Sequence, residues 1–143
     1  MSADTFPKET RILVVDDTPS IREDILTSLN RLGYTDVLQA SNGSEGWDVL
    51  SKPGVQVDLV ICDQNMPEMT GIQLLTKVRE SPLHGNLPFL MLTTEGDSEI
   101  VFTAIKLKVH SYLLKPFNTG SLQAKLKDVW KRVTSTKKPA PAK

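Results

Sequence analysis

The stretch VDLVICDQNMPEMTG, residues 57–71, decides the fold of this chain. Residues 57–62 are nearly all apolar, and the run closes on Asp63 before the loop that contains Met66-Pro67. A short apolar run with turn residues beyond it is typical of a strand that is buried on both faces. Asp63 would then lie at the carboxyl end of that strand, where its side chain can reach the edge of a sheet.

The same unit, an apolar run followed by a helical pattern, recurs on both sides of this stretch. Between the runs, apolar residues return at helical spacing, as at Ile21, Ile25 and Leu29. The segments with strand patterns are residues 11–15, 37–38, 57–62, 88–92 and 111–114. The segments with helix patterns are residues 20–32, 44–50, 72–80 and 100–105, and a last helix that is capped by Asn118 or Thr119 and lined by Leu122, Leu126 and Val129.

Apolar strands that alternate with helices predict an α/β fold with a doubly wound, five-stranded parallel sheet, the flavodoxin-like (βα)5 arrangement. The 143 residues have room for one such domain, which we expect to cover residues 10–133. Residues 1–9 are expected to form an N-terminal tail and residues 134–143 a flexible, basic C-terminal tail. The apolar runs are far shorter than the roughly 20 residues that cross a bilayer, so a cytoplasmic protein without membrane insertion is expected.

Polar residues that carry chemistry follow four of the five predicted strands. These are Asp16-Asp17, Asp63, Thr93-Thr94 and Lys115-Pro116. Each signal alone is ambiguous, because an acidic pair often caps a helix and a Lys-Pro pair, in either peptide isomer, often forms a turn. Together they converge, since parallel strands end at one edge of the sheet. Clustered acids beside an amine and a hydroxyl predict a site for a divalent metal ion and a phosphoryl group.

The chain resembles the receiver domains of two-component response regulators, and most closely the single-domain chemotaxis regulators of the CheY type. The resemblance runs from about residue 11 to residue 132. It rests on LVVDD at residues 13–17, DQNMPEMTG at 63–71, LTTE at 92–95 and YLLKPF at 112–117. It implies that a histidine kinase transfers a phosphoryl group to Asp63.

The resemblance also implies a Mg²⁺ cofactor and its ligands. Asp17, Asp63 and the backbone carbonyl of Asn65 would bind the ion directly, and Asp16 would act through a bound water. The divalent ion would offset the repulsion among the crowded carboxylates and neutralise the incoming phosphoryl charge.

Further roles follow from the same resemblance. Lys115 would pair with Asp63 before phosphorylation and with a phosphoryl oxygen afterwards, while Thr93 would donate its hydroxyl to another oxygen. Movement of Thr93 would let Tyr112 turn, which makes these two residues the switch pair. Asn65 and Glu95 would tune the lifetime of the phosphoprotein, which we expect to be short.

Some positions depart from the family pattern. Thr70 stands where Asp or Ser is usual and is expected to affect a helix cap, whereas Trp47 replaces a small residue and is expected to be a core or half-exposed aromatic. Lys108-Val109 replaces a usual Gly-Ala, so the sequence specifies neither the geometry of the turn before the last strand nor its effect on the partner surface. Cys62, the single cysteine, is expected to be a small buried hydrophobe.

The net charge of zero conceals two oppositely charged parts. Residues 1–99 carry 7 Lys and Arg against 16 Asp and Glu, whereas residues 100–143 carry 10 against 1. No RNA-binding motif or helix-turn-helix accompanies the basic part, so an acidic protein partner is favoured over nucleic acid. The predicted partner face consists of Lys106, Lys108, Tyr112, Lys125 and Lys127.

The sequence therefore favours a monomeric signalling switch that assists only its own phosphorylation and dephosphorylation, and is otherwise no enzyme. Its expected partners are a histidine kinase, a target such as the flagellar motor switch, and a phosphatase. A phosphate shuttle or sink in a phosphorelay, or the receiver part of a longer regulator, are alternatives. A Mg²⁺-dependent phosphatase of the haloacid dehalogenase type is disfavoured, because Thr18 stands where that family has its second Asp.

Overall fold

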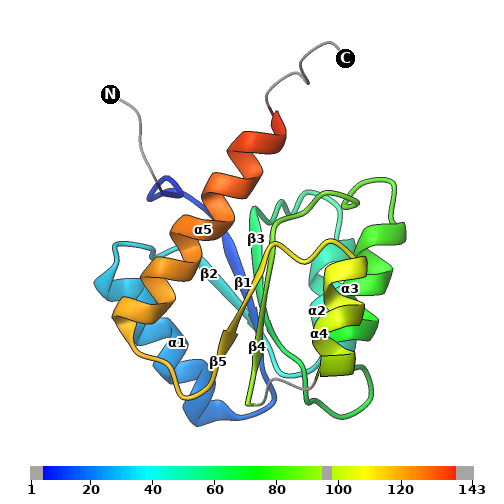
Figure 1. The fold of residues 1–143 in the computed structure, drawn as a ribbon, viewed down its shortest axis with the longest axis horizontal. Helices are drawn as coiled ribbons and strands as arrows, with labels where there is room; N and C mark the ends of the chain where they lie inside the picture. The colour runs from blue at the N-terminus through cyan, green and yellow to red at the C-terminus, as the bar shows by residue number, and fades with distance from the viewer. Residues whose placement is uncertain (1–4, 95–97, 138–143) are drawn as a thin grey trace.

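The computed structural model describes residues 5–94 and 98–137. Within these residues, five strands alternate with five helices in the predicted order, which confirms the (βα)5 architecture (Figure 1). The strands are β1 (Ile12–Val15), β2 (Val37–Ala40), β3 (Leu59–Asp63), β4 (Phe89–Thr93) and β5 (Ser111–Leu114). The helices are α1 (Pro19–Arg31), α2 (Gly43–Ser51), α3 (Gly71–Glu80), α4 (Ser98–Lys106) and α5 (Thr119–Lys137).

All strand pairs are parallel, and the strands lie in the order β2-β1-β3-β4-β5. Helices α1 and α5 cover one face of the sheet, and α2, α3 and α4 cover the other (Figure 1). Because both faces are covered, every residue of β1, β3 and β4 is buried, which explains their continuous apolar sequences. The strand order reverses between β1 and β3, the place where such sheets bind ligands.

Alternating strand residues divide the core into two layers. In β1, Leu13 and Val15 face α2 and α3, whereas Ile12 and Val14 face α1 and α5. Trp47 is partly buried in the first layer, where its ring stands edge-on to His84 at 6.3 Å between centroids. The expectation of a half-exposed core aromatic at this position is confirmed.

The structure describes part of each predicted tail, and both described parts adjoin the domain. Phe6 is only 4% exposed, and its ring lies 5.0 Å from the Trp130 ring of α5. The Tyr34 hydroxyl also donates a hydrogen bond to the Phe6 carbonyl at 2.8 Å. At the other end, α5 continues to Lys137, while residues 138–143 lie outside the described residues. Apolar burial of Phe6 against α5 therefore ties the segment before β1 to the domain.

The peptide bond between Lys115 and Pro116 is cis, which answers a question that the sequence left open. Asn118 caps the last helix, because its side-chain oxygen accepts a hydrogen bond from the backbone N–H of Ser121 at 2.7 Å. Among the residues that the structure describes, no helix combines the length and apolar character that would let it span a bilayer.

Candidate functional site

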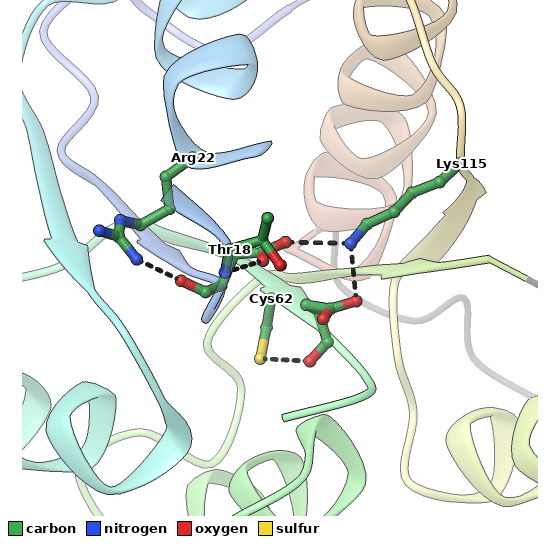
Figure 2. Close-up of polar contacts among 6 residues, drawn as sticks. Thr18, Arg22, Cys62 and Lys115 are labelled. Atoms are coloured by element: carbon green, nitrogen blue, oxygen red, sulfur yellow. Dashed lines mark hydrogen bonds and ion pairs between the residues drawn. The ribbon is translucent and has the colours of Figure 1, made fainter. Parts of the chain in front are cut away.

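The carboxyl edge of the sheet brings together an ammonium group and buried carboxylates from three strands. Asp16 follows β1 directly, Asp63 is the last residue of β3, and Lys115 follows β5. The Lys115 ammonium nitrogen lies 3.1 Å from Asp16 Oδ2 and 3.0 Å from Asp63 Oδ1 (Figure 2). Both carboxylates are almost fully buried, so these contacts are screened far less than surface ion pairs.

Asp17 completes an acidic cluster at this edge. One carboxylate oxygen each from Asp16, Asp17 and Asp63 lies within 4.8 Å of the other two. Opposite ligands of an octahedral Mg²⁺ ion are about 4.2 Å apart, given metal–oxygen distances of about 2.1 Å. The three oxygens are therefore close to the spacing that one ion needs, and they are the hard ligands that Mg²⁺ prefers. Asp17 is exposed, which leaves the cluster open to solvent.

Burial and charge perturb both members of the Lys115–Asp63 ion pair. Burial raises the pKa of Asp63, and the charges of Asp16 and Asp17 add to the increase, while the hydrogen bond from Lys115 opposes it. Burial alone would lower the pKa of Lys115, but hydrogen bonds to Asp63 and Asp16 outweigh this effect and raise it. Lys115 therefore stays protonated at neutral pH. Three acids around one ammonium leave the cluster short of positive charge, which favours a bound cation.

Backbone hydrogen bonds hold Asp16 in place. Its Oδ1 accepts the N–H of Thr18 at 2.9 Å, and its carbonyl oxygen accepts a hydrogen bond from Arg22 Nη1 at 2.6 Å (Figure 2). Its own N–H donates to the carbonyl of Ala40 in β2 at 3.1 Å. The position of this carboxylate is therefore set by β1, β2 and the first turn of α1 together.

The loop between β3 and α3 is fastened through Gln64. Its N–H donates to the Leu92 carbonyl at 3.0 Å, and its carbonyl accepts the N–H of Gly71 at 3.1 Å. Its side-chain oxygen accepts the N–H of Ile72 at 2.8 Å. Sequence reasoning missed Gln64 and Gly71, although a glycine at the first position of a helix signals a close approach. A Cβ on Gly71 would lie 2.6 Å from the carbonyl oxygen of Asp63.

Three other residues that the sequence singled out lie in this loop or just before it. Thr70 forms a reciprocal capping box with Gln73, so it does act as a helix cap. Asn65 is exposed two residues beyond Asp63. Cys62 is fully buried, and burial raises the pKa of its thiol well above the usual range, which confirms its expected role as a buried hydrophobe.

Thr93 and Tyr112 lie on the same side of the sheet. Thr93 ends β4, is 4% exposed, and accepts the N–H of Lys115 on its carbonyl at 2.7 Å. Tyr112 pairs with Met91, two residues before Thr93, and its partly buried ring packs on the layer below α4. Strand alternation therefore directs both side chains toward α4. Glu95, the other predicted lifetime residue, lies outside the described residues.

The predicted partner face contains a groove of about 570 Å³ over β5, between α4 and α5. Lys125 lines this groove, and its ammonium lies 6.0 Å from the centre of the Tyr112 ring. Lys106, Lys108 and Lys127 are exposed but are not among the lining residues. Sequence reasoning missed three exposed apolar side chains beside these lysines. They are Phe102, Ile105 and Leu114.

The turn before β5 keeps a conformation that usually belongs to glycine. Lys108 has a φ of 61°, in the left-handed region, which costs a side-chain-bearing residue roughly 1–2 kcal/mol. Its carbonyl accepts a hydrogen bond from Arg79 Nη2 at 2.9 Å, and this contact helps to hold the turn.

Comparison with known proteins agrees with this geometry. The response regulator receiver domain family matches residues 12–127. The chemotaxis protein CheY homolog of Campylobacter jejuni is 45% identical over 119 residues, which cover 83% of this chain and 91% of the relative. Chemotaxis protein CheY1 of Helicobacter pylori is 43% identical, over 83% of this chain and 95% of the relative.

Among solved structures, chemotaxis response regulator CheY4 of Vibrio cholerae has a TM-score of 0.77 and 35% identity, and the match covers 85% of this chain and 98% of that chain. These matches cover more than four fifths of this chain and more than nine tenths of each relative. The chain therefore belongs to the response regulator receiver domain family and is a phosphorylation-activated signalling switch of the CheY type.

Proposed function

We propose that this chain is a single-domain chemotaxis response regulator that accepts a phosphoryl group on Asp63 and then binds a target protein. The observation that carries the proposal is the cluster of Asp16, Asp17, Asp63 and Lys115 at one sheet edge. The names of the relatives from Campylobacter jejuni and Helicobacter pylori support the chemotaxis role. The proposed kinase and motor-switch partners imply a cytoplasmic location.

The chemistry follows from the positions of the side chains. A carboxylate oxygen of Asp63 attacks the phosphorus, and a P–O bond forms as the P–N bond to the kinase histidine breaks. The imidazole leaves with the bonding electron pair and is then protonated. Bound Mg²⁺ would neutralise charge on the phosphoryl oxygens, with Asp16, Asp17, Asp63 and the carbonyl of Asn65 as the residues that hold it.

Lys115 and Thr93 would stabilise the phosphorylated state. The Lys115 ammonium already lies 3.0 Å from Asp63, so it can transfer its contact to a phosphoryl oxygen with a small movement. The Thr93 hydroxyl would donate to a second oxygen. The protein thus supplies position and charge for its own phosphorylation, as other phosphoryl-transfer proteins do.

The target would bind the groove over β5 in the phosphorylated state. Lys125 and Tyr112 line the groove together with the apolar Ile105 and Leu114, so an acidic segment with apolar residues is the complementary partner. The flagellar motor switch is the target that the chemotaxis role implies. Rearrangement of Thr93 and Tyr112 would couple Asp63 to this groove, and a typical coupling of about 1–3 kcal/mol gives roughly 5–150-fold tighter binding.

Phosphorylation by a small donor tests the assignment directly. With acetyl phosphate and Mg²⁺, we expect intact-mass measurement to detect one added phosphoryl group, which disappears with EDTA and in Asp63→Asn. Asp24→Asn is the matched control, because Asp24 is an exposed acid on α1. Full labelling of Asp63→Asn would overturn the assignment of the phosphoacceptor.

A further inference from the structure

Arg22 reaches from α1 back to the loop that carries the acidic pair. Its Nη1 donates to the carbonyl oxygen of Asp16 at 2.6 Å, and its Nε lies 3.4 Å from the side-chain oxygen of Gln39 in β2. Figure 2 shows Arg22 on the opposite side of the site from Lys115, and a dashed line marks the contact of its guanidinium with this carbonyl. Arg22 therefore touches the backbone of the site and not its carboxylates.

The carbonyl that Arg22 holds belongs to the peptide that joins Asp16 to Asp17. A peptide unit is planar, so anchoring its oxygen also fixes the N–H and the Cα of Asp17. Asp16 is buried and held through both carboxylate oxygens, whereas Asp17 is exposed and has little packing around its side chain. The backbone therefore has the larger part in aiming Asp17.

On these grounds we propose that Arg22 is a positioning residue for the metal site, which sets Mg²⁺ affinity by orienting Asp17 through the Asp16–Asp17 peptide. This inference rests on the proposed function, because it needs Mg²⁺ to bind at the acidic cluster. Contacts that orient metal ligands commonly change metal affinity by 10–100-fold when they are removed.

A purely electrostatic role predicts the opposite sign. Arg22 carries a positive charge near the cluster, so its removal by charge alone would tighten Mg²⁺ binding. A purely structural role, in which Arg22 only fastens the first turn of α1, predicts lower stability without a specific change in metal affinity. The sign and the selectivity of the effect therefore distinguish the three roles.

Calorimetric titration of the unphosphorylated protein with Mg²⁺ measures the affinity without any reaction. We expect Arg22→Ala to weaken binding by about 10–100-fold and Arg22→Lys, which keeps the charge and one donor, to give an intermediate loss. Arg31→Ala is the control, because Arg31 is an exposed arginine in the last turn of the same helix. Unchanged or tighter binding by Arg22→Ala would overturn the proposal.

Two further readouts exclude a general structural effect. The Mg²⁺ concentration that gives half-maximal phosphorylation by acetyl phosphate should rise in Arg22→Ala, while the rate at saturating Mg²⁺ stays near that of the parent. The backbone ¹⁵N resonance of Asp17 should shift in Arg22→Ala and Arg22→Lys but not in Arg31→Ala. A lower saturating rate with an unchanged half-maximal concentration would refute the positioning role.

The two levels of the hypothesis fail in different ways. If the parent protein does not bind Mg²⁺, or binds it equally well with Asp17→Asn, the metal site of the proposed function is wrong. If the parent binds Mg²⁺ and Arg22→Ala and Arg22→Lys bind it equally well, only the role of Arg22 is wrong.

Discussion

Substitution of Gly71 by alanine tests how closely the site depends on the contact between α3 and β3. Gly71 begins α3, and a Cβ at this position would lie 2.6 Å from the carbonyl oxygen of Asp63 and 2.7 Å from Met91 Sδ. It would also lie 3.0 Å from the Cα of Gln64. Two of these three neighbours are backbone atoms, of Asp63 and Gln64, so the clash cannot be relieved by a side-chain rotation alone.

Helix propensity and packing predict opposite signs for this substitution. Alanine is more favourable than glycine inside a helix by about 1 kcal/mol. Overpacking of a dense region costs about 1–3 kcal/mol. Because the overlap involves backbone atoms, we expect packing to dominate and the free energy of unfolding to fall by about 1–2 kcal/mol. Displacement of the Asp63 carbonyl should also slow phosphorylation, by about tenfold, since misplacement by 1 Å can cost about a hundredfold.

Urea denaturation and the rate of phosphorylation by acetyl phosphate measure the two effects. Gly120→Ala is the matched control, because Gly120 lies in the first turn of α5 and its Cβ would meet only the side-chain oxygen of Asn118, at 3.3 Å. The control should be as stable as the parent or more stable by up to about 1 kcal/mol, because only the helix propensity acts there, and it should keep the phosphorylation rate of the parent. If Gly71→Ala were as stable as the parent and equally fast, the packing argument would be refuted.

Three other predictions follow from charge and burial. Asp63→Asn should raise the Tm at neutral pH without Mg²⁺, because the raised pKa of Asp63 means that folding disfavours its ionised form; an unchanged Tm would contradict this. Replacement of Lys106, Lys125 and Lys127 by Glu should lower both the association rate with the target and the salt dependence of that rate, but leave phosphorylation intact. Unchanged binding at low and high salt would show that the partner docks elsewhere. Burial, followed by the charges of Arg79 and Arg132, lowers the pKa of His110 from 6.5 to about 4. The unfolded chain therefore binds a proton that the folded protein excludes, so the free energy of unfolding should fall between about pH 6.5 and 4, and this part of the pH dependence should be absent in His110→Gln.

The candidate site was predictable because strand order along the chain and polar residues at strand ends are both local signals. Asp16, Asp63 and Lys115 each follow an apolar run, and parallel strands place their carboxyl ends at one edge. No detail of packing was needed to expect that these groups meet. The hydrogen bonds that Gln64 and Arg22 make to the backbone around the acidic cluster, in contrast, are specified by no local pattern.

The groove over β5 was predictable only in part. The excess of lysine after residue 100 is a compositional fact, and Lys125 and Arg132 from this part of the chain line the groove beside Tyr112 together with Asp128. The exposure of Phe102, Ile105 and Leu114 was not predictable, because helical and strand periodicity identify apolar stripes but not whether another element covers them. The apolar character of the groove therefore emerged from the structure.

By itself, the sequence determined the type and order of the elements, the parallel sheet and the edge at which the acids and the lysine meet. Those features depend on periodicity and composition within short segments, so the same pattern predicts them in any chain. Only the tertiary structure decided that Phe6 is buried against α5, since Phe6 and Trp130 are far apart in sequence and contact each other only after the sheet has formed. The same reason applies to Gly71. This position has no room for a Cβ, because the end of β3, which precedes it in the chain, packs against it in the folded protein.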